Sequence, residues 1–350
     1  MRAIVIGEPG SYSLTEVPDP VAGPRDVVVR VEAVGICGTD THVLDGEFAP
    51  TEYPIVPGHE TSGVVASVGS DVDEFAPGDR VSVDPSLYCG ECAFCTAGRP
   101  NLCESWDGTG VARTDGSTAE LVLAPVRCVH RLPDHVDLAL AALIEPLSCA
   151  IHGYDLLPRR MGEHYLVYGA GTMGLMMAQL APRAGAASVT VVDRLESRLE
   201  VAREVGVETV ALSAEEVARP GGWDVVIDCT GSPGAIEDGL GRVRRGGTFQ
   251  QFGVAAVDAR ASFSPFRIYN DEITMVGSMA VLNSYARAVE MFGAGALDAA
   301  AMVSHAFPLD GYGEAIEMFR AGSGRKLQIR PQLDAAVQLQ PTRPDREAGA

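Results

Sequence analysis

A glycine-rich turn near the middle of the chain constrains the fold more than any other feature. The apolar run at 165–168 leads directly into Gly169-Ala170-Gly171-Thr172-Met173-Gly174, and a helical stretch follows to about residue 183. In this Gly-x-Gly-x-x-Gly pattern the first glycine permits a tight turn, the second lets a pyrophosphate approach the backbone, and the third lets the helix pack on the strand. The helix N-terminus favours negative charge. The turn therefore predicts a dinucleotide site formed by Gly169, Gly171, Thr172, Met173 and Gly174.

An acidic residue at the expected spacing supports this interpretation. Asp193 ends the next apolar run and lies 193 − 174 = 19 residues beyond the last glycine, where about 20 is expected for the carboxylate that binds the adenosine ribose hydroxyls. Such a carboxylate would repel a 2′-phosphate, so we predict NAD rather than NADP. Arg194 and Arg198 leave NADP open, because either guanidinium could face a phosphate. A structural turn followed by a helix-capping aspartate is the remaining alternative.

The pattern of apolar runs differs between the two parts of the chain, and 350 residues suggest about two domains. Up to about residue 130, short β-rich runs are separated by Gly, Pro and Asp, which predicts an all-β unit. From about residue 164, apolar runs alternate with helical stretches, which predicts a doubly wound parallel sheet. Thr230 and Gly277 are expected at the carboxyl edge of that sheet, where cofactors bind, although ordinary turns explain them equally well.

Four of the eight cysteines lie close together in the sequence. They form the pattern Cys89-x-x-Cys92-x-x-Cys95, followed after seven residues by Cys103. In a reducing compartment such a cluster is more often a metal site than a disulfide framework. The surrounding segment is polar and rich in turn residues, which argues against cysteines buried merely as small apolar side chains. Four sulfur ligands leave no open position, so a zinc ion here would be structural.

The charge balance excludes several kinds of partner. Acidic residues outnumber basic ones 47 to 27, which gives a formal net charge of −20. Such a surface repels phosphate backbones and anionic lipid headgroups, so we expect neither nucleic acid nor membrane as a partner. The longest apolar stretches fall far short of the ~20 residues that span a bilayer, and the N-terminus lacks the pattern of a signal peptide. These features predict a cytoplasmic protein.

A second set of possible metal ligands is dispersed along the chain. Cys37 lies in Gly35-Ile36-Cys37-Gly38-Thr39-Asp40-Thr41-His42, and His59 and Glu60 lie in Pro57-Gly58-His59-Glu60. Alone, a cysteine is usually part of a core and a histidine usually a satisfied polar residue. In this order and spacing, and together with the cysteine cluster and the glycine turn, the set resembles the zinc-dependent medium-chain alcohol dehydrogenase family. The resemblance covers residues 1 to about 330.

The resemblance implies a fold and a pair of metal sites. It implies a GroES-like β-barrel catalytic domain over 1–150 and 285–350, and a Rossmann NAD-binding domain over 151–284. It also implies two zinc ions per chain, with Cys37 and His59 as ligands of the catalytic one. Glu145, in Glu145-Pro146-Leu147-Ser148-Cys149-Ala150, resembles the polyol and threonine dehydrogenase branch, so Glu60 and Glu145 are competing third ligands. The tail from about residue 338 lacks apolar periodicity, which predicts disorder.

The resemblance further implies a path for the proton that leaves the substrate. Thr39 would receive it, and His42 would deliver it to solvent after the cofactor ribose. The spacing fits this role, because Thr39 lies two residues past Cys37 and His42 lies three further on. Asp40 is expected to bond the second ring nitrogen of His59 and so to fix the ring for coordination. A loop acid that faces solvent is a serious alternative for Asp40.

Together these features predict an enzyme that reversibly oxidises a secondary hydroxyl of a polyol, sugar or cyclitol to a ketone. A small hydroxylated residue, Thr118, lies where relatives often carry an aromatic, which favours a hydrophilic small-molecule substrate. A threonine-type or simple secondary-alcohol dehydrogenase is the alternative within enzymes. A non-catalytic, redox-sensing protein that binds NAD and zinc is a distant alternative. The resemblance also implies a homo-oligomer, either a tetramer or a dimer.

Overall fold

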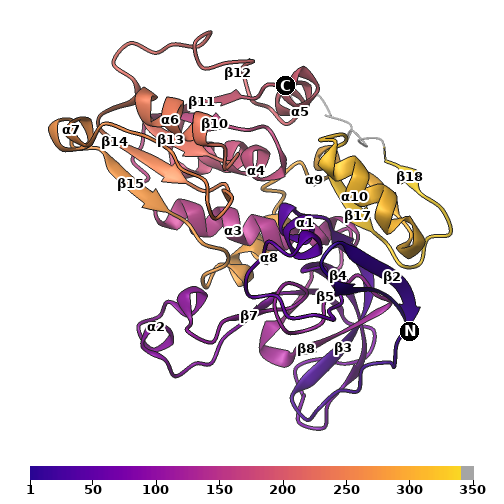
Figure 1. The fold of residues 1–350 in the computed structure, drawn as a ribbon. Helices are drawn as coiled ribbons and strands as arrows, with labels where there is room; N and C mark the ends of the chain where they lie inside the picture. The colour runs from indigo at the N-terminus through magenta and orange to yellow at the C-terminus, as the bar shows by residue number, and fades with distance from the viewer. Residues whose placement is uncertain (340–350) are drawn as a thin grey trace, which may run out of the picture. The chain divides into compact units, whose positions relative to one another are not determined.

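The computed structural model describes residues 1–339 and contains two compact units (Figure 1). Unit 1 comprises Met1–Ser148, Val281–Gly295 and the chain from Met302 onward, and unit 2 comprises Cys149–Ala280 and Ala296–Ala301. The expected divisions at 150 and 284 lie within four residues of these bounds. In the part of the chain that the structure describes, no helix is both long and apolar enough to cross a membrane.

One short segment belongs to a different unit from the one that we expected. We placed 285–350 entirely in the first domain, whereas Ala296–Ala301 clusters with unit 2. A hydrogen bond explains part of this placement, since the backbone N–H of Asp298 donates to Gln179 Oε1 at 2.7 Å. Gln179 lies on the helix that follows the glycine turn.

Unit 1 is built on an eight-stranded sheet with the order β18-β16-β17-β3-β4-β5-β9, in which β8 also pairs with β3. Branched valine side chains pack well on a pleated surface, and they fill most of the core beneath β3, β4, β5 and β8. The elements of its N-terminal part are β1 (Arg2–Glu8), β2 (Ser11–Glu16), β3 (Asp26–Gly35), α1 (Gly38–Asp45), β4 (Glu60–Val68), β5 (Arg80–Val83), β6 (Ser86–Leu87), α2 (Ala93–Thr96), β7 (Asp107–Gly108), β8 (Leu121–Pro125), β9 (Val129–Arg131) and the start of α3 (Ile144–Asp155).

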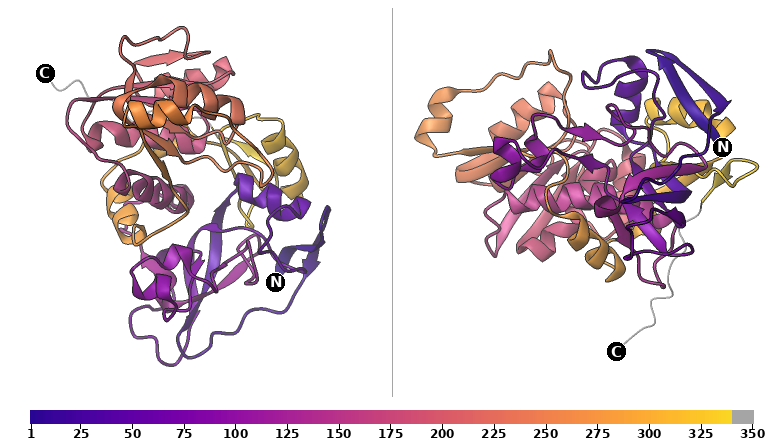
Figure 2. Two further views of the ribbon diagram at one scale, coloured as in Figure 1. Left: turned by 60° about the vertical axis from the view of Figure 1, so that its left-hand side comes forward. Right: turned by 90° about the horizontal axis from the view of Figure 1, so that it is seen from below.

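The C-terminal part of the chain returns to unit 1. Strand β17 pairs antiparallel with β3, so that Gln328 lies opposite Gly35 and Ile329 opposite Val34. Figure 2 shows the yellow C-terminal elements beside the indigo N-terminal strands. The C-terminal strands thus extend the sheet that the N-terminal part of the chain begins. Unit 1 here contains α8 (Tyr285–Gly293), β16 (Val303–Phe307), α10 (Tyr312–Arg320), β17 (Lys326–Ile329) and β18 (Val337–Gln338), while most of α9 (Ala299–Met302) lies in the segment that clusters with unit 2.

The predicted start of the disordered tail, at about residue 338, is too early in the chain. Residues 337 and 338 form β18, which pairs antiparallel with β16 through Ala306 and His305. Backbone pairing needs no apolar side-chain pattern, and for that reason the composition of the tail did not indicate this strand. The remainder of the expected disordered tail, from residue 340, lies outside the described residues.

Unit 2 is a six-stranded sheet with the order β12-β11-β10-β13-β14-β15, and every neighbouring pair is parallel. From β10 the chain adds β11 and β12 on one side, and then adds β13, β14 and β15 on the other side. Doubly wound folds bind nucleotides at such a change of side, here between β10 and β13. The predicted Rossmann architecture is therefore confirmed. Its elements are β10 (Glu163–Tyr168), α4 (Thr172–Leu180), β11 (Ala186–Val192), α5 (Glu196–Glu204), β12 (Thr209–Ala211), β13 (Trp223–Asp228), α6 (Pro233–Arg242), β14 (Val243–Gln251), α7 (Pro265–Asn270) and β15 (Thr274–Gly277).

Candidate active site

The turn between β10 and α4 has the geometry that its glycines predict. Gly169 has a φ of 95°, a conformation that L side chains rarely adopt. A Cβ on Gly174 would lie 1.7 Å from the carbonyl oxygen of Gly169, so only glycine lets α4 pack this close to the turn. A Cβ on Gly171 would meet nothing within 4 Å. The backbone at Gly171 is thus open on the side from which a pyrophosphate would approach, next to the N-terminus of α4.

Asp193 is fastened to this turn at the end of β11. Its Oδ2 accepts a hydrogen bond from the backbone N–H of Ala170 at 2.8 Å, and its Oδ1 accepts one from that of Leu195 at 2.9 Å. A carboxylate has about four acceptor sites, so capacity remains for ribose hydroxyls. Arg198 Nη1 lies 3.7 Å from Asp193 Oδ2, and Arg194 is exposed. Of the two arginines that left NADP open, Arg198 therefore already faces a carboxylate.

A buried carboxylate that the sequence analysis did not single out shapes the loop after β13. Asp228 is fully buried and accepts hydrogen bonds from Thr230 Oγ1 at 2.6 Å, from the backbone N–H of Gly231 at 2.9 Å and from Gln251 Nε2 at 2.8 Å. Its position at the end of an apolar run was the only available signal. The Thr230 hydroxyl holds the loop, and Gly277 pairs with Gln251 in the sheet. Contacts of Thr230 and Gly277 with a cofactor stay predictions.

Cys37, His59 and Glu60 come together because β3 and β4 are antiparallel neighbours. Gly35 at the end of β3 lies opposite Glu60 at the start of β4, and Cys37 follows two residues later at the start of α1. One ligand atom from each of Cys37, His59 and Glu60 lies within 4.8 Å of the others. His59 and Glu60 are buried, and Cys37 is half-buried. Sulfur, imidazole and carboxylate are the donors that zinc takes in proteins, so the residues fit the ion.

Asp40 lies where it can orient the His59 ring. Its Oδ1 is 3.5 Å from His59 Nδ1, and its Oδ2 accepts a hydrogen bond from the backbone N–H of Cys37 at 2.8 Å. Burial alone would lower the pKa of His59, but the neighbouring Asp40 and Cys37 raise it well above its ordinary value. Asp40 is itself 3% exposed, which removes the alternative of a loop acid that faces solvent. An Nδ1 directed at Asp40 leaves Nε2 for a metal ion.

Glu60 has one oxygen in an ion pair and one without a partner. Lys326, from β17, donates from Nζ to Glu60 Oε1 at 2.7 Å and to the Ile36 carbonyl oxygen at 3.0 Å. Burial alone would lower the pKa of Lys326, but the Glu60 carboxylate raises it, so the lysine is charged. Glu60 Oε2 is buried and has no hydrogen-bond partner among residues 1–339. An unpartnered buried carboxylate oxygen is costly without a cation, which supports a metal ion beside it.

The four clustered cysteines lie on one short lobe around α2. Cys103 Sγ is 3.5 Å from Cys89 Sγ and 3.9 Å from Cys92 Sγ, and all four sulfur atoms lie within 4.8 Å of one another. A tetrahedron with Zn–S bonds of about 2.3 Å has sulfur atoms about 3.8 Å apart, so the spacing fits zinc.

The backbone around the lobe favours thiolates. Backbone N–H groups of Cys92 and Ser105 donate to sulfur at 3.4 and 3.3 Å, and backbone donors lower the pKa of Cys92 to about 6. Desolvation raises the pKa of Cys95 to about 12, so Cys92 loses its proton more readily than Cys95. A closed set of four sulfur ligands leaves no position for a substrate.

Comparison with known proteins identifies the architecture. Residues 23–134 match the alcohol dehydrogenase GroES-like domain, and residues 172–294 match the zinc-binding dehydrogenase domain. The chain is 38% identical to D-altritol 5-dehydrogenase of Agrobacterium fabrum over 320 residues, which is 88% of this chain and 93% of the relative. It belongs to the zinc-dependent medium-chain alcohol dehydrogenase family. This family's members are oxidoreductases, and zinc and NAD(P) are its cofactors.

Two further relatives of this dehydrogenase bear on its substrate and cofactor. L-threonine 3-dehydrogenase of Streptomyces coelicolor is 38% identical over 292 residues, which cover 79% of this chain and 83% of the relative. The crystal structure of a zinc-binding dehydrogenase from Sinorhizobium meliloti 1021, bound to NADP, matches with a TM-score of 0.91 and 35% identity. That match covers 94% of this chain and 99% of the other.

Three further predicted site residues of this dehydrogenase lie on two helices, α1 and α3. Thr39 Oγ1 lies 3.8 Å from Cys37 Sγ, and both Thr39 and His42 lie on α1. His42 is partly exposed, and its Nδ1 lies 2.8 Å from Glu47 Oε2. Glu145 is buried at the start of α3 and is not a member of the metal-ligand group found among the described residues. The choice between Glu60 and Glu145 as third ligand stays a prediction.

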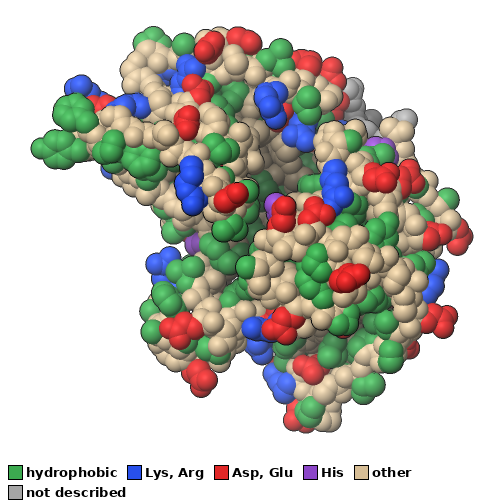
Figure 3. Space-filling model, in the orientation of Figure 1, with side chains coloured by type: hydrophobic (Ala, Val, Ile, Leu, Met, Phe, Trp, Pro, Cys, Tyr) green, Lys and Arg blue, Asp and Glu red, His purple; other side chains and the backbone are tan. Residues whose placement is uncertain are grey.

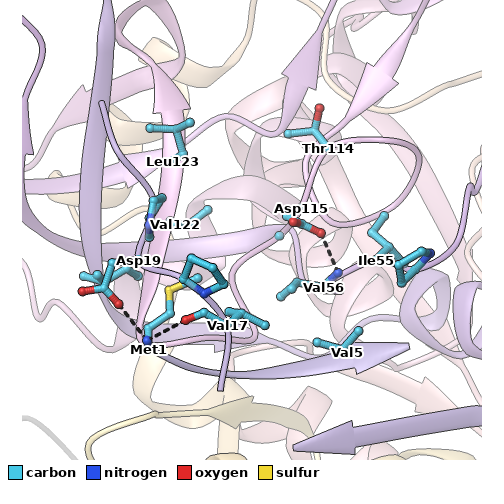
Figure 4. A pocket seen from close by; sticks show the side chains of 15 residues that line it. Met1, Val5, Val17, Asp19, Ile55, Val56, Thr114, Asp115, Val122 and Leu123 are labelled. Atoms are coloured by element: carbon cyan, nitrogen blue, oxygen red, sulfur yellow. Dashed lines mark hydrogen bonds and ion pairs between the residues drawn. The ribbon is translucent and has the colours of Figure 1, made fainter. Parts of the chain in front are cut away.

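A large pocket in unit 1 contains none of these residues. It has a volume of about 550 Å³ and is lined mainly by apolar side chains near β1 and β8, including Val5, Ile55 and Val122 (Figure 4). Its charged groups already have partners, because the N-terminal ammonium pairs with Asp19 at 2.7 Å and Asp115 accepts a backbone hydrogen bond at 2.8 Å. This pocket lacks the chemistry for hydride transfer.

Proposed function

We propose that this dehydrogenase reversibly oxidises a secondary hydroxyl of a polyol, sugar or cyclitol to a ketone, with NAD as the hydride acceptor. The observation that carries the proposal is the group of Cys37, His59 and Glu60, in which a buried carboxylate oxygen of Glu60 has no hydrogen-bond partner within residues 1–339. The similarity to D-altritol 5-dehydrogenase supports a polyol as substrate. The four-cysteine lobe, in contrast, fits a structural zinc.

The residues of the site divide the chemistry between them. Cys37 and His59, with Glu60 or Glu145, would hold a zinc ion, and the glycine turn with Asp193 would hold NAD; when bound, the two groups would supply Lewis acidity and a hydride acceptor. Asp40, whose Oδ1 is 3.5 Å from His59 Nδ1, would keep the ring in one orientation when Nε2 binds the metal. The Thr39 hydroxyl, two residues after Cys37, accepts the proton of the substrate hydroxyl and releases its own proton toward His42. His42 passes that proton to solvent, a role that its partial exposure and its contact with Glu47 support.

We propose NAD rather than NADP on the basis of Asp193. Its carboxylate is fixed by two backbone N–H groups beside the glycine turn. A fixed negative charge at this place repels a 2′-phosphate, whereas it accepts hydrogen bonds from ribose hydroxyls. The arginine that could neutralise a phosphate, Arg198, lies against the same carboxylate.

A panel of substrates tests the proposal directly. NAD reduction is measured with sorbitol, arabinitol, inositols, threonine and 2-propanol, and the highest kcat/KM is expected with a polyol or cyclitol. The similarity to L-threonine 3-dehydrogenase makes threonine oxidation the second candidate. Activity confined to threonine would establish that candidate, and activity confined to 2-propanol would refute the polyol assignment. The Cys37→Ser variant is the control, since it should be inactive with every substrate.

We also propose that the enzyme is a homo-oligomer, a dimer or a tetramer, and that it is cytoplasmic. Strand β15 is the edge of the unit 2 sheet, and its Met275 is 44% exposed. Nearby on α7, Phe266 and Tyr269 are 69% and 82% exposed, and Figure 3 shows hydrophobic side chains gathered over this helix. An unpaired edge flanked by exposed apolar side chains suits a second copy of the chain. A reducing compartment suits thiols that serve as metal ligands.

Light scattering on the purified enzyme tests the assembly. The wild-type enzyme should have a mass of two or four chains, and Phe266→Asp should shift it toward the monomer, because a charge at the centre of an interface is costly. Glu237→Gln, on α6, is the matched control and should leave the mass unchanged. A monomeric wild-type enzyme would refute the assembly and leave the assigned reaction untouched.

A further inference from the structure

Lys326 is the only lysine in the sequence, and it is almost completely buried. A buried lysine costs free energy unless it is paired, so its retention at such a position needs a partner. That partner is Glu60, whose Oε1 accepts its hydrogen bond at 2.7 Å. The pair joins β17 to the start of β4, 266 residues apart in sequence.

Glu60 is confined on two sides. The Lys326 ammonium donates a hydrogen bond to Oε1, and it is itself held in place by a second hydrogen bond to the Ile36 carbonyl oxygen at 3.0 Å. Gly35 lies against the second oxygen, where a Cβ would come within 1.9 Å of Glu60 Oε2. The absence of a side chain at Gly35 therefore leaves the space that Oε2 occupies. The carboxylate has one oxygen engaged and one oxygen available, in a fixed orientation.

The charges of the group give the lysine a second role. Asp40 and Glu60 carry one negative charge each, and Cys37 adds a third when it binds a metal as the thiolate. A zinc ion contributes two positive charges and Lys326 one, so the filled site is neutral. Buried sites strongly favour such neutrality because unpaired charges are poorly solvated there.

We propose that Lys326 is a positioning residue of the catalytic metal site: it ties up Glu60 Oε1 and offsets its charge, so that Glu60 presents only Oε2 to the metal ion. This inference rests on the proposed zinc site of Cys37 and His59. Without the lysine, both carboxylate oxygens are available and a positive charge that repels zinc is gone. The metal is then held more tightly and in a different coordination geometry.

The test uses the full-length enzyme with zinc or with cobalt in its place. Lys326→Met should release zinc to a chelator more slowly, by about 10-fold or more: loss of most residues behind a ligand lowers metal affinity by about this factor, whereas loss of a cation beside the metal should raise it. The visible spectrum of the cobalt enzyme should change as well, because it reports ligand number and geometry. Lys326→Arg, which keeps the cation, should resemble the wild-type enzyme. Subtraction of the Cys37→Ser spectrum isolates the catalytic site from the cysteine lobe.

The background of Glu60→Ala separates positioning from general structural effects. In that background, Lys326→Met should change neither the zinc release rate nor the cobalt spectrum. Equal changes with and without Glu60 would overturn the inference, as would a Lys326→Met enzyme with wild-type release and spectrum. If Lys326→Met does not fold, Gly35→Ala decides: displacement of Oε2 should give the cobalt spectrum of Glu60→Ala, and a wild-type spectrum would overturn the inference.

Different results would refute the proposed zinc site and the proposed role of Lys326. A Cys37→Ser enzyme that still holds two metal ions would refute the zinc site itself. A Cys37→Ser enzyme that loses one ion, together with an unchanged Lys326→Met enzyme, would refute only the role of the lysine.

Discussion

Replacement of Asp193 by alanine tests the nucleotide site most sharply, because one carboxylate both bonds the glycine turn and, as we propose, binds the ribose hydroxyls. The variant loses two hydrogen bonds to a charged acceptor, from the backbone N–H groups of Ala170 and Leu195. Such bonds contribute about 1.5–3 kcal/mol each. The exposed N–H of Leu195 regains a bond to water, whereas the N–H of the buried Ala170 does not regain one fully, so we expect a net loss of about 2–3 kcal/mol. That corresponds to about 6–9 °C in the Tm of unit 2.

The effect on cofactor binding follows from the same carboxylate. Loss of the charged acceptor for the ribose hydroxyls should weaken the binding of NADH by roughly 10- to 100-fold. The affinity for NADPH should fall much less, since the repulsion of its 2′-phosphate disappears at the same time. The preference for NADH over NADPH therefore narrows. Fluorescence titration with each reduced cofactor measures both affinities without a substrate, and a thermal melt measures Tm.

Asp193→Asn is the matched control, because its side-chain oxygen can still accept one backbone hydrogen bond. It should recover about half of the Tm loss, yet recover little of the preference for NADH, since the negative charge is absent. If Asp193→Ala keeps the wild-type Tm and the wild-type ratio of affinities, the carboxylate neither supports the turn nor selects the cofactor, and our account of this site is wrong.

The remaining predictions concern the metals, the proton path and the glycine turn. Metal analysis should find about two zinc ions per chain, and Cys37→Ser should retain one ion and its fold without turnover. Cys103→Ser should lose the other ion and lower Tm, because a partly liganded lobe cannot close around zinc. Thr39→Val should keep both ions and NADH affinity while kcat falls by about 10²-fold or more; an unchanged kcat would remove Thr39 from the proton path. Gly174→Ala should destabilise unit 2 and abolish NADH binding, since its Cβ would lie 1.7 Å from a carbonyl oxygen.

The features that could be predicted from the sequence are those whose geometry depends only on residues within one short segment. The turn requires a positive φ at Gly169 and a close approach to the backbone at Gly174. Only glycine meets either requirement, so the two glycines occur at a fixed spacing in the sequence. The cysteine lobe is similar, since its four ligands lie within one loop. In such cases the spacing of residue types is enough to predict the site.

The features that sequence did not reveal depend on strand register or on distant segments. Nothing near Glu60 indicates that Lys326 will lie beside it, because β17 joins the sheet next to β3 only in the folded chain. The hydrogen bond from Gln251 Nε2 to the buried Asp228 likewise depends on β13 and β14 being neighbours. The pairing of β18 with β16 is backbone pairing and leaves no pattern in side chains.

The route of the chain through unit 1 has a consequence for biosynthesis. While the ribosome adds residues in order, Cys37, His59 and Glu60 emerge early, whereas the ammonium that compensates Glu60 follows 266 residues later. Until β17 arrives, the edge of β3 and a buried carboxylate lack their final partners. Unit 2, whose strands are continuous in sequence, has no such delay. A nascent chain that stops before residue 326 therefore exposes an open sheet edge, and such truncated chains should be the ones that aggregate or recruit chaperones.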